Sequence, residues 1–127
     1  MSPCLLLIEL DGAYGIARLG PSEVVPDWAN GSGFVSVSRS DEELSVVCRA
    51  DRIPEDIRHD SGWSCFKFQG PFDFGETGIM LSVIKPLSEE GIGVFVVSTF
   101  DTDYLLVKAV SRVRVVELLA EAGHTVR

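Results

Sequence analysis

The stretch EEGIGVFVVSTFDTDYLLV, residues 89–107, decides the fold. Its two glycines follow a helical pattern, and residues 94–99 are apolar on both faces, which predicts a central β-strand. The polar residues 100–103 predict a turn, and residues 104–107 predict the returning strand. A helix, a loop and a β-hairpin in this order form the middle of a β-α-β-β-α-β unit.

The segments on both sides of this stretch complete the unit. The aromatic-rich residues 63–69 predict its first strand, and apolar residues at helical spacing predict a helix from Glu76 or Thr77 to Glu90. Residues 109–122 predict a second helix, capped by Gly123 and followed by a short terminal strand. The expected inner positions are Met80, Val83, Ile84 and Leu87 in the first helix, and Val110, Val113, Val116 or Glu117, and Ala120 in the second.

Two residues are expected to shape the end of the first helix. Pro86 lacks a backbone N–H, which predicts a kink near Ser82. Gly91 follows the last helical residue, where a left-handed cap favours glycine.

A shift of sixty residues reveals an internal repeat. Gly31-Ser32-Gly33 falls on Gly91-Ile92-Gly93, and Asp41 falls on Asp101, without a gap. The repeat predicts duplication of one supersecondary unit, with an abbreviated unit at residues 1–60 and a complete one at 61–127.

The first copy has shorter helical segments than the second. Single helical turns fit within residues 21–30 and 53–57, and Asp11-Gly12 predicts a hairpin between the first two strands. Its expected strands are residues 5–10, 14–19, 34–38 and 44–49. We therefore expect an α+β protein, two ferredoxin-like βαββαβ units in tandem, the first with shortened helices.

The composition excludes several classes of protein. A chain of 127 residues with 46% hydrophobic and 24% charged residues is typical of a folded protein. The net charge of −8 and the scattered basic residues argue against nucleic-acid binding. The sequence has no apolar segment of membrane-spanning length and no pattern of a signal peptide, so we expect a cytoplasmic protein without membrane contact.

No residue pattern predicts catalysis. Cys4, Cys48 and Cys65 lie in strand patterns, so they are expected to pack as reduced thiols and to form neither disulfides nor a zinc site. His59 precedes Cys65 by six residues, but it lies in a polar segment, which disfavours a Cys–His dyad. Both Gly-x-Gly patterns precede strands, unlike nucleotide-binding loops. We expect no enzyme activity, no metal and no cofactor.

Residues 89–107 resemble the ACT-domain pattern, and Phe74 to Ile79 fit the same group. More narrowly, the chain is similar to small bacterial tandem ACT proteins whose domains also occur in the animal cytosolic arginine sensors. The resemblance implies a ferredoxin-like fold and allosteric sensing of a small ligand, usually an amino acid. In such domains the ligand binds where the helix-to-strand loop of one unit meets the strand edge of another.

The resemblance places ligand-binding residues in a loop and a turn. They are Gly91, Ile92, Gly93 and Val94 in the loop, and Thr99, Phe100 and Asp103 in the turn. The glycines expose main-chain groups to a zwitterion, and Asp103 suits its amino group. Thr99 suits its carboxylate, and Phe100 suits its side chain. In the alternative reading, Gly91 caps a helix, Gly93 makes a bend and Asp103 bonds its own turn.

Two functions remain open at this point. The first is an amino-acid-binding regulatory module, and the second is a protein-interaction or scaffold module with a vestigial pocket. A homodimer is expected in either case, because sheet edges of such units tend to be paired or covered.

Overall fold

The computed structural model describes residues 4–69 and 77–127, which divide into two compact units. Met1–Leu10 and Ser64–Arg127 form one of them, here called the discontinuous unit. Asp11–Trp63 form the other, called the inserted unit because it interrupts the first along the chain. The expected units at 1–60 and 61–127 differ from this division in two places. Residues 1–10 belong to the discontinuous unit, where their strand pairs, and residues 61–63 belong to the inserted unit.

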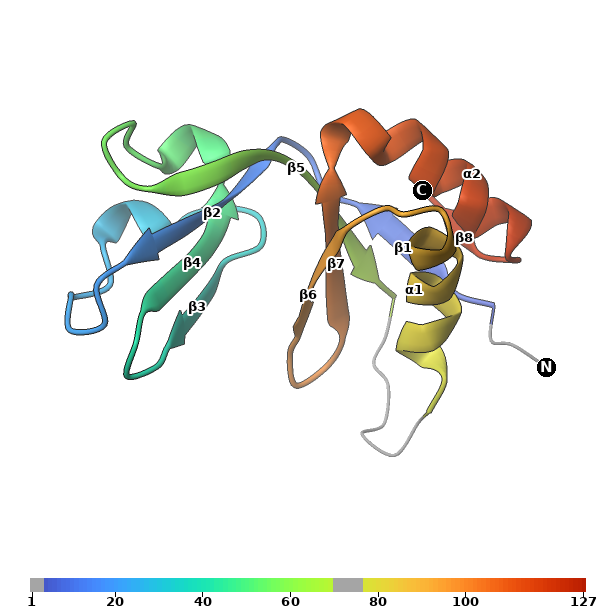
Figure 1. Cartoon of the computed structure of the whole chain (residues 1–127), viewed down its shortest axis with the longest axis horizontal. Helices are drawn as coiled ribbons and strands as arrows, with labels where there is room; N and C mark the ends of the chain where they lie inside the picture. Colours follow the sequence, from blue (N-terminus) through green and yellow to red (C-terminus); the bar gives the residue numbers. More distant parts are fainter. Residues whose placement is uncertain (1–3, 70–76) are drawn as a thin grey trace. The chain divides into compact units, whose positions relative to one another are not determined.

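The discontinuous unit has the expected β-α-β-β-α-β order with one additional strand. Its elements are β1 (Leu6–Glu9), the second half of β5 (His59–Phe68), α1 (Ile79–Glu89), β6 (Val94–Ser98), β7 (Asp103–Lys108), α2 (Arg112–Glu121) and β8 (Thr125–Val126). The strands lie in the order β6-β7-β5-β1-β8, and α1 and α2 lie side by side (Figure 1). This is the ferredoxin-like α+β fold expected from the sequence.

The additional strand, β1, lies between β5 and β8. It runs antiparallel to β5, with Leu7 opposite Phe68, and parallel to β8, with Leu6 opposite Thr125. The predicted hairpin through Asp11-Gly12 is therefore wrong. Gly12 does turn the chain, at φ 84°, but β2 (Tyr14–Leu19) pairs with β4 and with the first half of β5.

Each unit has its own apolar core. In the discontinuous unit, Phe66, Phe68, Leu105 and Val107 pack against the buried faces of α1 and α2. The buried residues of α2 are Val115, Leu118 and Leu119, whereas Val110 and Val113 are exposed. Val116 packs against the core as predicted, but the inner positions predicted at Val110 and Val113 were wrong, because Ala109–Ser111 form a 3₁₀ turn and the α-helical phase starts only at Arg112.

The inserted unit keeps the strand arrangement without the helices. Its elements are β2, a 3₁₀ turn η1 (Asp27–Ala29), β3 (Ser36–Arg39), β4 (Leu44–Arg49), a 3₁₀ turn η2 (Ala50–Arg52) and the first half of β5. The order β3-β4-β2-β5 matches β6-β7-β5-β8 of the other unit once β1 is left out. Short turns stand where the other unit has helices, as expected, although η2 begins three residues before the predicted position at 53.

The two outer hairpins have the same register. A shift of 59 residues places the pair Ser36–Val47 of β3 and β4 on the pair Phe95–Leu106 of β6 and β7. The hydrogen bonds that close the turns correspond as well: Ser40 N–H to Glu43 O at 2.9 Å and Thr99 N–H to Thr102 O at 2.8 Å. The sequence offset of sixty is thus one residue too long for the hairpins, and the shared register supports the predicted duplication.

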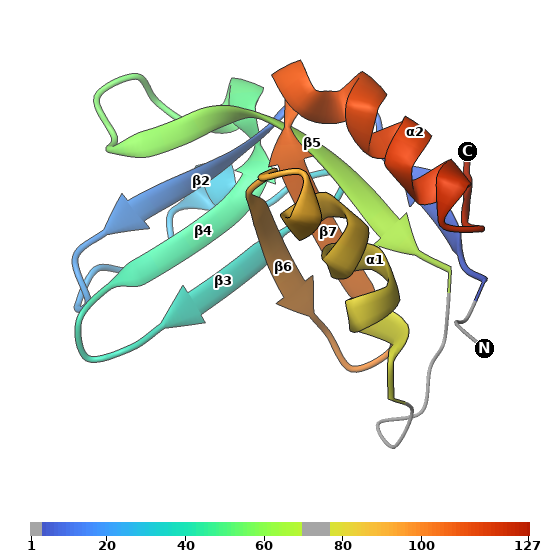
Figure 2. The ribbon, with the colours of Figure 1, turned by 45° about the vertical axis from the view of Figure 1, so that its right-hand side comes forward.

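The strand predicted to be central lies at an edge. Among the described residues β6 pairs only with β7, within the hairpin that lies beside α1 in Figure 2.

In the described part of the chain, no helix has the length and apolar character needed to cross a bilayer.

Candidate functional site

The loop between α1 and β6 contains four of the predicted ligand residues, and its first half caps the helix. Gly91 adopts φ 73°, its N–H donates to Ser88 O at 3.0 Å, and the Ile92 N–H donates to Leu87 O at 3.0 Å. This is a Schellman motif, in which glycine occupies the left-handed position. Ile92 also packs against the apolar core. The cap reading of Gly91 is therefore confirmed, and two N–H groups of the loop are used by the helix.

Space is open beside the two glycines of this loop. Apart from the adjacent residues of the chain, no heavy atom of the described residues lies within 4 Å of the positions that a Cβ would take at Gly91 or Gly93. Gly93 does not have a positive φ, so neither its backbone nor a described neighbour requires glycine there.

The corresponding loop of the inserted unit is filled. A Cβ on Gly31 would collide with the guanidinium of Arg52, and one on Gly33 would collide with the hydroxyl of Tyr14. These groups hold the loop: Arg52 Nη2 donates to Ser32 O at 3.0 Å, and the Phe34 N–H donates to the Tyr14 hydroxyl at 3.0 Å. The glycines of this loop thus make room for the protein's own side chains.

Arg114 of α2 holds the start of the open loop. Its Nη2 donates to Glu90 Oε1 at 2.6 Å, and its Nη1 donates to Glu117 Oε2 at 3.1 Å. These hydrogen bonds, first that with Glu90, raise the pKa of the Arg114 guanidinium. The side chains are about half exposed, so the pairs orient the loop more than they stabilise the fold.

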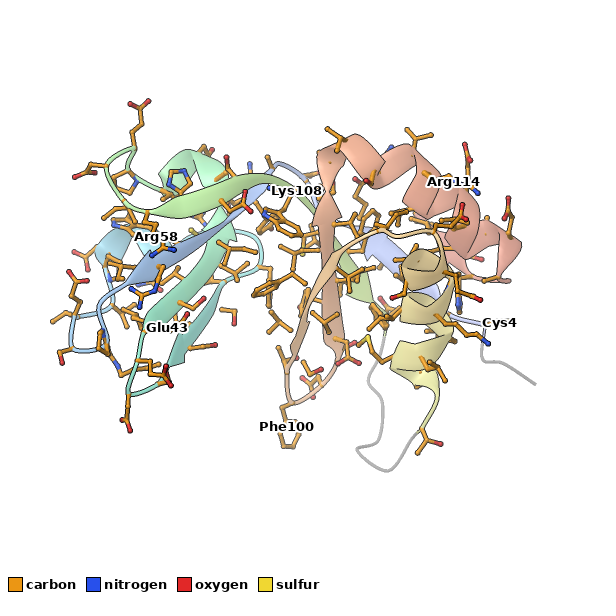
Figure 3. All side chains as sticks on the ribbon, in the orientation of Figure 1. Cys4, Glu43, Arg58, Phe100, Lys108 and Arg114 are labelled. Carbon is orange, nitrogen blue, oxygen red and sulfur yellow. The ribbon has the colours of Figure 1, made fainter. Side chains whose placement is uncertain are left out.

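The turn between β6 and β7 is held by its own side chains. The Thr99 hydroxyl donates to Thr102 O at 2.9 Å and accepts from the Thr102 N–H at 3.3 Å. Thr102 is buried, and its hydroxyl donates to Phe68 O of β5 at 2.6 Å. The Thr99 hydroxyl, predicted to donate to a carboxylate, is therefore used within the turn. Phe100 lies at the tip with 80% of its surface exposed (Figure 3).

Asp103 has a partner that the sequence analysis missed. The Ser98 hydroxyl donates to Asp103 Oδ1 at 2.5 Å, which leaves the second carboxylate oxygen to accept from another donor. The two residues are directly opposite in the hairpin. The tight turn at 99–102 was the signal that could have identified Ser98.

Within one unit the loop and the turn lie at opposite ends of the β6–β7 hairpin. Val94 pairs with Val107 at one end, and Ser98 pairs with Asp103 at the other. Figure 3 shows this separation between Phe100 and Lys108. From Gly93 to Thr99 the extended chain covers about 20 Å at roughly 3.3 Å per residue. The discontinuous unit by itself thus does not bring the seven predicted residues together.

Two of the three thiols offer little reactivity, whereas Cys4, which was predicted to pack, is exposed. Cys48 and Cys65 are fully buried, and burial raises the pKa of Cys65 to about 12 and also raises that of Cys48. A thiol with a raised pKa stays protonated near neutral pH and is a poor nucleophile. Within residues 4–69 and 77–127, no three His, Cys, Asp or Glu side chains gather as a potential metal site.

Comparisons with known proteins agree with this architecture. A family model described as an ACT domain matches residues 58–121, and one described as an N-terminal domain matches residues 12–56. A protein from Agobacterium tumefaciens is 61% identical and has a TM-score of 0.95, with 99% of this chain and 94% of that chain covered.

Two more distant structures cover most of both chains. A Vibrio cholerae protein of unknown function, described as a possible transport protein, is 15% identical, with a TM-score of 0.76 over 94% of this chain and 90% of that chain. The regulatory subunit of aspartate kinase from Thermus thermophilus, in its ligand-free form, is 6% identical, with a TM-score of 0.53 over 87% of this chain and 93% of that chain. At these identities the likeness is one of fold.

Proposed function

Because this chain belongs to the ACT-domain family, we propose that it is a regulatory module that binds a small ligand, an amino acid, and has no catalytic activity of its own. It acts in the cytoplasm, on a protein partner whose association changes when the ligand binds. The fold shared with an aspartate kinase regulatory subunit supports the regulatory role. A ligand acts in this way only by binding one of two states more tightly than the other.

One observation carries the ligand-binding proposal: the two equivalent glycine loops differ in what lies beside them. Arg52 and Tyr14 fill the space at Gly31 and Gly33, whereas the described residues leave the space at Gly91 and Gly93 open. An open loop with a backbone held by a helix cap and by Arg114 is suited to receive a ligand without reorganisation. We therefore assign one ligand site to the discontinuous unit and none to the inserted unit.

The loop and the turn offer different recognition groups, and they lie at opposite ends of the β6–β7 hairpin, so one unit by itself does not present both to the same small ligand. Asp103 retains one oxygen for an ammonium group, since Ser98 occupies only Oδ1. Phe100 is exposed at the tip of the same turn, where an aromatic ring can cover an apolar side chain. The ligand carboxylate would be bound by main-chain N–H groups near Gly93, because those of Gly91 and Ile92 serve the helix cap.

A thermal-shift screen of the twenty amino acids tests the proposal. A ligand that binds only the native state raises the melting temperature, by an amount that grows with its concentration above Kd. We expect one amino acid, or a small group of similar ones, to stabilise the protein at millimolar concentration. If none of the twenty changes the melting temperature, amino-acid sensing is excluded.

Gly93→Ala tests the location of the site. The added methyl group should abolish the ligand-induced shift and leave the fold intact, because Gly93 has an ordinary φ and open space. Gly20→Ala is the matched control: it adds the same group at an ordinary φ in the inserted unit and should leave the shift unchanged. A normal shift in Gly93→Ala would remove the loop from the site.

The second candidate function is a protein-interaction module with a vestigial pocket. The internal bonds of Thr99, Ser98 and Asp103 favour it, because they satisfy groups that a ligand would otherwise use. The same screen separates the two functions: a scaffold binds a protein partner with an affinity that no amino acid alters.

A further inference from the structure

Arg52 is the last residue of the 3₁₀ turn η2, and its side chain reaches the glycine loop of the inserted unit. Its Nη2 donates to Ser32 O at 3.0 Å, and its guanidinium lies where a Cβ of Gly31 would be. A glycine at this position leaves room for the planar cation beside the backbone of the loop. The loop thus receives a cation from its own chain.

The same guanidinium lies beside the thiol of Cys48. Cys48 in β4 is fully buried, and burial raises the pKa of its thiol, whereas the charge of Arg52 and a hydrogen bond from it act in the opposite direction. The Ser32 carbonyl and the Cys48 thiol therefore provide two acceptors for one guanidinium. Because Cys48 belongs to the apolar core of this unit, the cation contacts both the core and the loop.

One donor of this guanidinium is not satisfied. In the part of the chain that the structure describes, Arg52 Nε is buried and has no hydrogen-bond partner. A buried donor without a partner costs stability, and such a local conflict is expected at a functional site more than in a structural contact. Arg52 therefore occupies this space without the full set of bonds that stability alone would favour.

The discontinuous unit has a serine at the position equivalent to Arg52. The turns η2 (Ala50–Arg52) and η3 (Ala109–Ser111) each follow directly on the second strand of the duplicated hairpin. The shift of 59 residues that aligns the two hairpins places Arg52 on Ser111. The two units thus differ here by one long cationic side chain.

This difference accounts for the open loop of the discontinuous unit. Arg114 lies three residues after Ser111 and donates to Glu90 at the start of that loop, so position 111 is on the side of α2 next to the loop. A serine is too short to fill the space, which is open beside Gly91 and Gly93.

We infer that the inserted unit contains a binding site for a guanidinium-type cation, which Arg52 occupies as a tethered ligand. A ligand attached to its own site has a high effective concentration, so the site stays occupied. The inserted unit thus remains in its occupied state, whereas the open loop of the discontinuous unit responds to a free molecule. The response of the open loop rests on the proposed function, and the tethered ligand does not.

Chemical rescue tests the site. Arg52→Ala deletes the heavy atoms of ethylguanidinium, so this cation should bind and raise the melting temperature of the variant by about 4 °C at ten times its Kd. N-ethylurea has a similar shape and no charge, and it should not raise the melting temperature. The wild type should respond to neither compound, because Arg52 fills the space. An equal response of variant and wild type to ethylguanidinium, or no response of the variant, would overturn the inference.

The rescue remains decisive if Arg52→Ala does not fold by itself. Ethylguanidinium should then restore the folded state, which the fluorescence of Trp28 reports, because Trp28 packs against the core of the inserted unit. A variant that stays unfolded with the cation would count against a binding site.

Labelling of Cys48 locates the rescue. In the background Cys4→Ser, a thiol reagent should modify Cys48 several-fold faster in Arg52→Ala, and ethylguanidinium should restore the slow rate. The buried Cys65 of the discontinuous unit should be unaffected. Arg39→Ala is the matched control, because Arg39 also donates to two carbonyl oxygens of this unit but is exposed. Rescue without protection of Cys48 would place the cation elsewhere and remove the site.

A reciprocal substitution tests the equivalence of the two positions. Ser111→Arg should fill the open loop and abolish the rise in melting temperature that an amino acid causes, whereas Ser111→Ala should retain it. A normal response in Ser111→Arg would contradict the equivalence. If the wild type binds no amino acid, the proposed function fails and the rescue of Arg52→Ala still decides the tethered ligand, so the two proposals fail separately.

Discussion

His124 donates from Nε2 to the carbonyl oxygen of Ser82 at a distance of 3.0 Å. In a regular α-helix this oxygen would accept the N–H of residue 86, but Pro86 has none. The other ring nitrogen, Nδ1, accepts the Leu5 N–H at 3.1 Å, which fixes the hydrogen on Nε2. A buried imidazole thus satisfies the carbonyl that a proline left without its helical partner and ties it to the segment leading into β1.

Replacing His124 should be among the costliest single changes in the protein. His124→Ala leaves the Leu5 N–H and the Ser82 oxygen without their partners in a buried place, so we expect a loss of about 3 kcal/mol in the free energy of unfolding. Urea denaturation measures it. In the Pro86→Ala background, where the new backbone N–H can donate to the Ser82 oxygen, the loss should be smaller by about 1 kcal/mol. If the effects of His124→Ala and Pro86→Ala on the free energy of unfolding simply add in the double variant, the two residues are not coupled.

Thr102→Val should loosen the β6–β7 turn. Valine has a similar shape but cannot donate to Phe68 O, so we expect a loss of about 1 kcal/mol in unfolding free energy and faster amide exchange in the turn. Thr99→Ser is the matched control, because it keeps the hydroxyl that bonds Thr102 and should change stability by less than about 0.5 kcal/mol. Equal effects of both variants would remove the anchoring role of Thr102.

Gly33→Ala should destabilise the inserted unit. Gly33 has φ 87°, which costs a residue with a Cβ about 1–2 kcal/mol, and the new methyl group would also collide with the Tyr14 hydroxyl. We expect a total loss of at least about 2 kcal/mol. Gly93→Ala should keep the wild-type stability or gain up to about 1 kcal/mol, because alanine can adopt its backbone conformation. Thermal melts of the two variants decide whether the equivalent loops differ as described.

One of the three thiols should react in the native protein. Cys4 is exposed, whereas Cys48 and Cys65 are buried. A thiol reagent at pH 8 should therefore modify one cysteine quickly and all three in denaturant.

Burial of Cys65 should also make stability depend on pH. In the folded state burial raises the pKa of Cys65 to about 12, above its ordinary value of 9.0, so the free energy of unfolding should fall as the pH rises from 9 towards 12. Rapid native modification of Cys65 would contradict its burial.

The features that depend on neighbouring residues could be predicted from the sequence. Gly91 and Gly123 both end helices in Schellman motifs, because a glycine after an amphipathic segment determines the cap locally. The hairpin of β6 and β7 was predicted for the same reason, since a short polar turn separates two apolar runs.

The predictions that were wrong concern features that depend on distant parts of the chain. The apolar pattern of Leu6–Glu9 indicates a strand but not its partners, and those lie more than fifty residues away in β5 and β8. The residues of β6 likewise do not indicate whether one strand or two lie beside it. At the candidate site, the residue types are those that bind an amino acid. The hydrogen bonds of Ser98 with Asp103 and of Thr99 with Thr102 can be recognised only once the register of the hairpin is known.

The pairing of Leu6 with Thr125 has a consequence for synthesis on the ribosome. The inserted unit is continuous in sequence, so it can form its contacts while later residues are still being added. The strand β1 is made before it, yet both of its neighbours in the sheet are made afterwards. An early apolar segment therefore stays without its sheet partners until the residues that follow the inserted unit have been made.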